Sequence, residues 1–159
     1  MNLQLLKSLL DRHTYVIQRL VEQAFHPKDH PIDAFRQFLY AYVDCSFENP
    51  KPLIIAVREI GLLNQRPDIL KNLQRAMLEV NAVCIEALKR EKKMKLLRNI
   101  DIELTVLSFS STVDSYLVNA FMFESEFPFV GMSVMTPEDM KLRLKKHLSL
   151  MLDQISFEQ

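Results

Sequence analysis

The side chains best suited to chemistry are four histidines, and their sequence surroundings match no familiar metal centre. A helical di-iron site needs a glutamate three residues before a histidine on two helices. None of His13, His26, His30 and His147 is preceded by such a glutamate. Residues 26–30, His-Pro-Lys-Asp-His, bring two histidines and an aspartate together, but the prolines predict a loop and nothing supplies the further ligands of a zinc site. We therefore expect no metal and no other cofactor.

The sequence also lacks the motifs of nucleophilic and of nucleotide-dependent enzymes. Ser110 and Asp114 are four residues apart on one expected helix face, but no histidine is near them in sequence to activate the serine. The motifs HExxH and GxSxG do not occur, and two glycines in 159 residues give almost no material for a phosphate-binding loop. The sequence therefore predicts a protein that is not an enzyme.

The balance of charge argues against a dedicated nucleic-acid-binding protein. The chain has 20 basic and 20 acidic residues, so it lacks the overall positive electrostatic field of a nucleic-acid-binding protein. One dense basic segment, residues 89–98, holds six basic residues and one acid. It could contact nucleic acid or an acidic partner, but we interpret it as a solvated helix end, where cations complement the helix dipole.

Apolar runs and cysteines indicate a cytoplasmic protein with no membrane partner. The longest central apolar run, residues 52–57, is far shorter than the roughly 20 residues of a membrane-spanning helix. The first 13 residues do not have the pattern of a signal peptide. Cys45 and Cys84 form no Cys-x-x-Cys motif, so we interpret them as buried thiols.

Helical periodicity accounts for almost the whole chain. Apolar side chains recur every three or four residues, and no segment alternates cleanly as a strand would. We therefore predict one all-α domain of about six helices in an antiparallel bundle. The expected helices span residues 3–24, 31–47, 53–60, 67–93, 102–124 and 137–155.

Proline and glycine mark a short segment near the middle of the chain. Pro50 and Pro52 stop the preceding helix, because proline removes a backbone donor and restricts the residue before it. Gly61 is expected to end the short helix in a left-handed conformation. The two-turn helix between these breaks would be marginal alone, so its neighbours must hold it.

Cap residues are expected at the last two helices. Asn99 or Asp101 can cap the helix that begins at residue 102, and Thr136 can cap the final one, with Asp139 in the capping-box position.

The order of these pieces resembles the C-terminal domain of a TetR-family transcriptional regulator. The matching features are a Pro-x-Asp-Ala-φ-Arg helix that ends in Glu-Asn-Pro, a short Leu-Ile-Ile-Ala-Val-Arg-Glu-Ile helix, a long helix that opens with Pro-Asp-Ile-Leu, and a final Thr-Pro-Glu-Asp-Met helix. They cover nearly the whole chain. In that family the domain dimerises and encloses a small-molecule pocket, while a separate N-terminal helix-turn-helix reads DNA.

The resemblance implies that residues 1–159 form a single ligand-binding and dimerisation domain. No helix-turn-helix is recognisable in the sequence, so the chain alone is not expected to bind nucleic acid. The short segment, residues 52–63, corresponds to the helix that relays ligand occupancy, although it could equally be a packed connector. A rigid two-turn unit can shift because the change in φ and ψ is confined to its ends.

The same resemblance places a pocket for a lipophilic effector among the second to fifth helices. Its candidate lining is apolar with a few polar groups, and Asn81 would orient a ligand if it points inward. The candidate ligand-binding residues are Phe38, Tyr42, Cys45, Arg58, Met77, Asn81, Cys84, Phe109, Val113 and Tyr116.

A homodimer through the last two long helices is also expected. The last helix has more apolar residues than one core-facing stripe requires, and the extra ones are Leu142, Leu150 and Leu152. Small side chains on the preceding helix would allow a second copy to approach closely. The candidate interface residues are Ser108, Ser111, Ser115, Leu142, Leu148 and Leu152.

A helical protein-interaction module without a pocket is the alternative function. An enclosed cavity of several hundred cubic ångströms would favour the sensing domain, and a filled interior would favour the interaction module.

Overall fold

Seven helices make up the parts of the chain that the computed structural model describes, which are residues 2–26, 30–122 and 135–157. No β-strand lies within these residues. The all-α prediction is confirmed. The helices are α1 (Leu3–Ala24), α2 (Pro31–Glu48), α3 (Lys51–Arg58), α4 (Ile60–Asn64), α5 (Pro67–Lys93), α6 (Ile102–Met122) and α7 (Pro137–Ile155).

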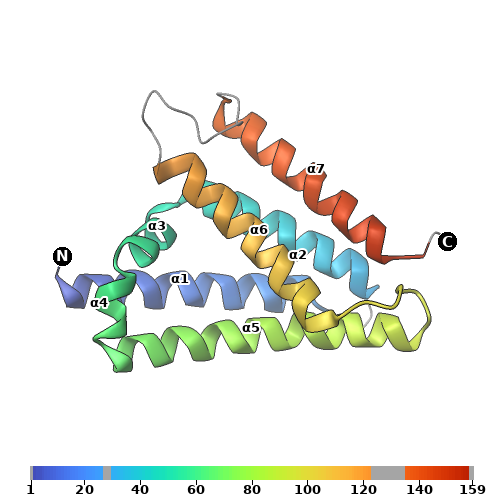
Figure 1. Ribbon diagram of the computed structural model, residues 1–159, viewed down its shortest axis with the longest axis horizontal. Coiled ribbons are helices and arrows are strands. Elements are labelled where there is room, and N and C mark those ends of the chain that lie inside the picture. The colour runs from blue at the N-terminus through green and yellow to red at the C-terminus, as the bar shows by residue number, and fades with distance from the viewer. Residues whose placement is uncertain (1, 27–29, 123–134, 158–159) are drawn as a thin grey trace.

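The helices form a bundle in which the second and last long helices are close neighbours. Helix α7 lies antiparallel to α2, and α6 crosses in front of α2 (Figure 1). Helices α1 and α5 lie side by side and run in the same direction, with α3 and α4 connecting the two layers at one end. The ends of α2, α5 and α7 meet at the opposite end of the bundle.

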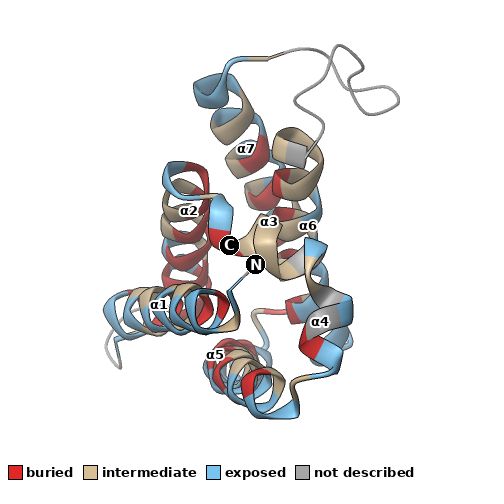
Figure 2. Ribbon diagram, turned by 90° about the vertical axis from the view of Figure 1, so that its left-hand side faces the viewer, coloured by how far each residue is buried: buried red, intermediate tan, exposed pale blue. Residues whose placement is uncertain are grey.

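Two groups of buried apolar side chains hold this arrangement. The larger group joins α1, α2, α5, α6 and α7, whose buried faces point inward (Figure 2). The smaller group consists of Leu6, Leu10, Leu63 and Ile69, and it fixes α4 between α1 and α5. In α6 and α7 the buried side chains recur at three- and four-residue spacing, namely Val106, Phe109, Val113 and Leu117, and Leu144, Leu148 and Leu152.

Side-chain caps begin three of the helices. The Asn2 side chain accepts a hydrogen bond from the Gln4 amide, and that of Asp101 accepts one from Leu104 at 3.0 Å. The Thr136 hydroxyl accepts one from the Asp139 amide at 3.2 Å and donates one to the Asp139 carboxylate. Of the two predicted caps of α6, Asp101 therefore forms the bond. The predicted end of that helix near residue 124 lies outside the described residues.

The expected C-cap at Gly61 is wrong. The break falls at Glu59, after α3 ends at Arg58, and Gly61 is an ordinary residue of α4 without a left-handed φ. The Leu63 amide donates to the Glu59 carbonyl at 2.9 Å, so the chain turns helical again at once. This second helix delivers the fully buried Leu63 side chain to the smaller core, which a coil after Gly61 would not do.

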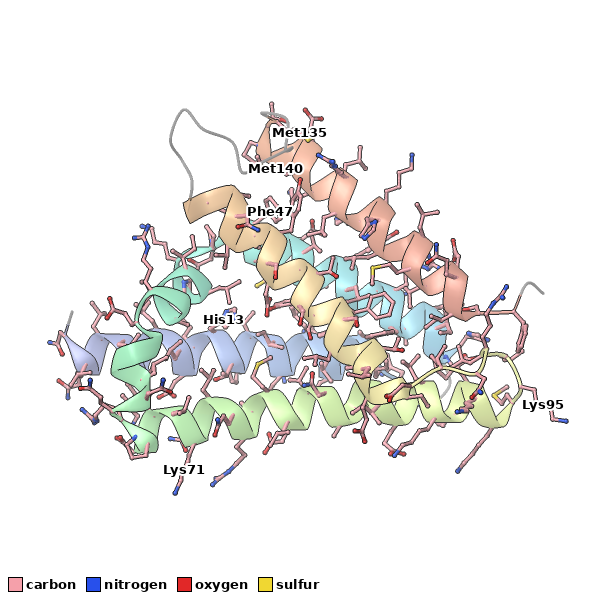
Figure 3. All side chains as sticks on the ribbon, viewed as in Figure 1. His13, Phe47, Lys71, Lys95, Met135 and Met140 are labelled. Atoms are coloured by element: carbon pink, nitrogen blue, oxygen red, sulfur yellow. The ribbon has the colours of Figure 1, made fainter. Side chains whose placement is uncertain are left out.

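Helix α5 ends in a left-handed turn at Lys95. Lys95 has a φ of 59°, and the Leu96 amide donates to the Glu91 carbonyl at 3.1 Å while that of Lys95 donates to Lys92. These two bonds form a Schellman motif, in which glycine usually occupies the left-handed position. Figure 3 shows Lys95 at the tip of this connection.

The end of the chain is hydrogen-bonded to the connection between α5 and α6. The Arg98 amide donates to the Ile155 carbonyl at 2.9 Å, and the Phe157 amide donates to Leu96 at 3.0 Å. The pair Leu97 and Ser156 forms an isolated antiparallel bridge between these two bonds. This C-terminal clasp ties the last helix to the end of α5.

Candidate functional site

The centre of the bundle contains a small apolar cavity between α1, α2, α5 and α6. Its volume is about 20 Å³, and its wall is almost entirely apolar. Four of its twelve lining residues are aromatic side chains from α2 and α6. The lining residues are Ile17, Phe35, Phe38, Leu39, Tyr42, Met77, Val80, Asn81, Cys84, Val106, Phe109 and Ser110.

The aromatic rings of the wall pack against one another. Phe38 and Tyr42, one turn apart on α2, stack with ring centres 6.1 Å apart, and Phe35 meets the edge of Phe109 at 5.2 Å. Such pairs stabilise a core by about 0.5–1.5 kcal/mol beyond the area that they bury. These contacts tie the aromatic residues of α2 to one another and to α6.

A buried polar pair lies at one side of the cavity. The Tyr42 hydroxyl donates to the Asp114 carboxylate at 2.5 Å. Burial raises the pKa of Asp114, although the hydrogen bond from Tyr42 partly opposes the rise. Burial, together with the Asp114 charge, raises the pKa of Tyr42 well above its usual range. The hydroxyl therefore remains a donor at neutral pH, and the pair links α2 to α6.

Six of the ten predicted ligand-binding residues line the cavity. They are Phe38, Tyr42, Met77, Asn81, Cys84 and Phe109. Each lies on the inward face of α2, α5 or α6, where helical spacing placed it.

The other four candidates lie elsewhere. Arg58 is exposed at the end of α3, and Cys45 is half-buried on α2. Val113 is fully buried in the core beside the cavity, and Tyr116 packs against that core without lining the cavity. Helical periodicity gives the inward direction of a side chain but not its height along the bundle, which separates these residues from the lining set.

The cavity is much smaller than the expected pocket. A volume of about 20 Å³ is little more than the space for one water molecule, whereas sites for small organic ligands typically measure about 300 Å³ or more. Apolar residues that the sequence analysis did not include among the ligand-binding candidates, such as Ile17, Phe35 and Leu39, also line this small cavity. In this conformation the cavity among the described residues is too small for an organic ligand.

The structure divides the expected interface residues into two groups. Ser108, Ser111 and Ser115 are exposed on α6, and Leu142 is 69% exposed on α7. Leu148 and Leu152 are wholly buried inside the same chain, so neither offers surface to a second copy.

The placement of Leu148 and Leu152 in an interface is therefore wrong. They belong to the stripe Leu144, Leu148 and Leu152, which packs on the core facing α2.

Two further apolar residues of α6 are exposed and were missed by the sequence analysis. Leu104 is 60% and Leu107 is 53% exposed, and both lie near Ser108 and Ser111 on the outer face of the helix. The signal was present, because these leucines fall outside the buried spacing of Val106, Phe109 and Val113.

The bundle closely resembles two solved bacterial regulators. The TetR-family transcriptional regulator PfmR from Thermus thermophilus matches with a TM-score of 0.71 and 16% identity, over 97% of this chain and 75% of that chain. The fold of the present chain is therefore that of TetR-family regulators. A tetR-family regulatory protein from Rhodococcus RHA1 matches equally well, with a TM-score of 0.71 and 14% identity over 98% of this chain and 75% of its own. At the level of sequence, no protein-family model and no curated protein matches the chain.

Within this TetR-like fold, the described residues contain no cluster built for a metal. No group of three or more His, Cys, Asp or Glu side chains among them is arranged to hold an ion. Burial raises the pKa of the Cys84 thiol to about 12, so it remains protonated at neutral pH. Among the helices described, none combines the length and the apolar character needed to cross a membrane.

Proposed function

We propose that the chain is the effector-sensing and dimerisation domain of a TetR-type transcriptional regulator, with no enzymatic activity. Residues 1–159 act as one such domain in a cytoplasmic protein, and the chain alone does not bind an operator. The observation that carries the proposal is the apolar cavity at the centre of a bundle that has the TetR fold. Asn81, Ser110 and Tyr42 give this wall its few polar groups.

The effector is proposed to be lipophilic, because the wall offers mainly aromatic and aliphatic surface. A cavity of about 20 Å³ must expand to admit it. Met77 and Cys84 on α5 are candidates for this rearrangement, since the thioether of methionine adapts easily to new neighbours. The opening of the bundle would then move α5 relative to α6.

The break between α3 and α4 is where such a movement can be absorbed. Helix α3 contacts α1 and α6, and helix α4 contacts α5, so the two short helices together touch three of the helices around the cavity. A shift of α5 would therefore be passed through α4 to α3, with the change of backbone angles near Glu59. Residues 52–63 keep the relay role that the TetR resemblance implies.

Cavity binding can be tested by thermal unfolding with n-decanol as a lipophilic probe. A ligand that binds only the folded state raises its melting temperature. We expect a dose-dependent rise of several degrees that disappears in Ser110→Leu, which fills the cavity. Ser111→Leu is the matched control, because the neighbouring serine is exposed and should keep the rise. If n-decanol and its eight- and twelve-carbon homologues leave the melting temperature unchanged, the sensing proposal fails.

The homodimer is proposed to form through the outer faces of α6 and α7. Leu104, Leu107, Leu142 and Leu150 are more than half exposed on these two helices, which pack against each other within the chain. Two copies related by a twofold axis would cover all four leucines. The exposed serines of α6 allow the two backbones to approach closely.

Sedimentation equilibrium tests the dimer. The native chain should sediment at twice its mass of 18.6 kDa, and the double variant Leu107→Glu with Leu142→Glu should sediment as a folded monomer. Leu78→Glu, a change at an equally exposed leucine on α5, should leave the mass at twice that of one chain. A native chain that stays monomeric at high concentration would contradict the proposal.

A helical protein-interaction module remains the second candidate function, and the small volume of the central cavity among the described residues favours it. Such a module would use the apolar outer face of the bundle to hold a protein partner, with no effector in its centre. The n-decanol experiment separates the two functions, because only the sensing domain can be stabilised from inside.

A further inference from the structure

A second and quite different pocket lies at the end of the bundle where α2 begins and where α5 and the chain end. It is open to solvent and has a volume of about 300 Å³. Polar and charged side chains dominate its wall, in contrast to the central cavity. The lining residues are His30, Ile32, Asp33, Arg36, Glu91, Leu96, Asp153, Ser156 and Phe157.

The carboxylate of Glu91 is the unusual element of this wall. Its side chain is 0% exposed, although it lines the pocket. The Oε1 atom lies 3.0 Å from His30 Nδ1 and accepts a hydrogen bond from the Ile32 amide at 3.3 Å. The Oε2 atom has no hydrogen-bond partner among the described residues. A buried carboxylate oxygen without a donor is costly, so a ligand that supplied a donor to this atom would gain free energy.

His30 holds the carboxylate from one side only. Its Nδ1 is within ion-pair distance of Glu91, yet the two atoms do not meet the geometry of a hydrogen bond. Its Nε2 also has no partner among the residues described. The histidine therefore leaves the second oxygen of Glu91 without a hydrogen-bond donor, in a side chain that lines the pocket.

The remaining charges make the pocket acidic. Asp33, Glu91 and Asp153 supply three carboxylates, while Arg36 is the one guanidinium among the described lining residues. Arg36 is already engaged, because it donates to the Ser149 hydroxyl at 2.6 Å and to Asp153 at 2.9 Å. Among the described lining side chains, Asp33 and Glu91 are thus the two carboxylates without a guanidinium partner, while the Arg98 guanidinium lies 5.8 Å from the centre of the Phe157 ring at the edge of the pocket.

We propose that this pocket binds a small molecule through a primary ammonium group, with Glu91 Oε2 as the acceptor. An ammonium carries three donors and a positive charge, so it satisfies the unpartnered oxygen and offsets the acidic wall. The exposed Asp33 carboxylate at the rim supplies a second electrostatic attraction. Phe157 and Leu96 offer apolar surface for a short hydrocarbon chain attached to the amine.

An organic cation suits the site better than a metal ion. Glu91 and His30 provide two metal-binding side chains next to each other, whereas protein metal sites usually take three or four protein ligands. The pocket volume is also near the lower end of the range for organic ligands. This site is separate from the central cavity, so its occupancy does not depend on the proposed lipophilic effector.

The proposal can be tested by titrating the folded chain with butylamine and following amide chemical shifts by NMR. The Ile32 amide is the reporter, because it donates directly to the Glu91 carboxylate. We expect a saturable shift at Ile32 with a dissociation constant of about 1 mM, as befits so small a ligand. The uncharged n-butanol, which has the same chain length, should produce no saturable shift there.

Matched variants assign the contact to Glu91. Glu91→Gln should weaken butylamine binding about tenfold or more, because a charge-assisted hydrogen bond is lost. Glu86→Gln, on the same helix but exposed, should leave it unchanged. Should Glu91→Gln fail to fold, Asp33→Asn replaces it, and reduced affinity in that variant supports the proposal while unchanged affinity contradicts it.

Three results would overturn the site. They are the absence of a saturable shift at Ile32, an equal shift with n-butanol, and a shift that is unchanged in Glu91→Gln. Shifts centred on Asn81 and Ser110 instead would assign butylamine to the central cavity, which also contradicts the proposal.

Discussion

His13 is a titratable residue on the inner side of α1. It faces α3 in Figure 3, and burial lowers the pKa of its imidazole below 6.5. The unfolded chain therefore takes up a proton at this residue before the folded chain does, as pH falls through 6.5. The contribution to stability is complete above that pH and declines below it, by up to about 1.4 kcal/mol per pH unit.

We expect His13→Gln to flatten this part of the pH dependence. Urea unfolding at about pH 7 and at about pH 5.5 should show a smaller difference in the variant than in the native chain. His147→Gln, a change at an exposed histidine of α7, serves as the control and should keep the native difference. Equal differences in all three proteins would show that His13 does not titrate as proposed.

The Tyr42–Asp114 pair offers a second test at the level of single residues. Tyr42→Phe removes the only donor described for Asp114 and leaves a buried carboxylate unpaired, so the free energy of unfolding should fall by about 1–3 kcal/mol. Asp114→Asn should cost less, because the amide oxygen can still accept from Tyr42. Urea denaturation of the two variants gives the comparison, and a larger loss in Asp114→Asn would contradict it.

At the scale of elements, Gly61 shows how a local sequence signal can mislead. Gly61 lies within α4 with no atom closer than 4 Å to an added Cβ, so nothing in the fold requires glycine. Gly61→Ala should therefore raise the free energy of unfolding by about 0.5–1 kcal/mol. Chemical denaturation would detect the gain, whereas a loss of stability would restore the left-handed cap that the sequence suggested.

Lys95 presents the opposite case at the end of α5. Its φ of 59° lies in the left-handed region, where a residue with a Cβ is strained. Lys95→Gly should stabilise the chain by about 1 kcal/mol, and Lys89→Gly, at an exposed position inside the helix, should destabilise it by a similar amount. Thermal unfolding of the two variants should shift in opposite directions. Shifts of the same sign would contradict the Schellman assignment.

These two positions explain how much of the fold could be predicted. Long helices follow from apolar spacing and caps, and so the limits of α1 and α5 agree with the prediction. Gly61 and Lys95 could not be assigned, because a glycine permits a left-handed turn without requiring one. The packing of Leu63 decides the first case and the clasp with residues 155–157 decides the second.

The candidate site, like the fold, could be predicted only in part from the sequence. Spacing placed Phe38 and Phe109 on inward faces, but it could not separate lining residues from neighbours such as Val113, which differ in height along the bundle. It also could not show that the cavity is small, since cavity volume depends on the packing of several helices at once. The polar pocket around Glu91 was missed, because the basic run that surrounds this residue suggested a solvated helix end.

At the scale of the whole molecule, the last helix contributes separately to the core and to the outer surface. Leu148 is 0% exposed and Leu150 is 52% exposed. Leu148→Ala should lower the free energy of unfolding by about 2–5 kcal/mol, whereas Leu150→Ala should change the stability of the monomer by less than about 0.5 kcal/mol. Urea denaturation at low protein concentration measures both, and similar losses would place Leu150 in the core.

The docking of α7 on α2 has a consequence for synthesis of the chain. The buried face of α2 gains part of its cover only when α7 arrives, and the C-terminal clasp closes after that. About 90 residues separate the two helices. At a translation rate of roughly 5–20 residues per second, the apolar face of α2 that α7 later covers stays exposed on the nascent chain for about 4 to 18 seconds. Chaperones that bind exposed apolar helices could bind this face of α2 during that interval.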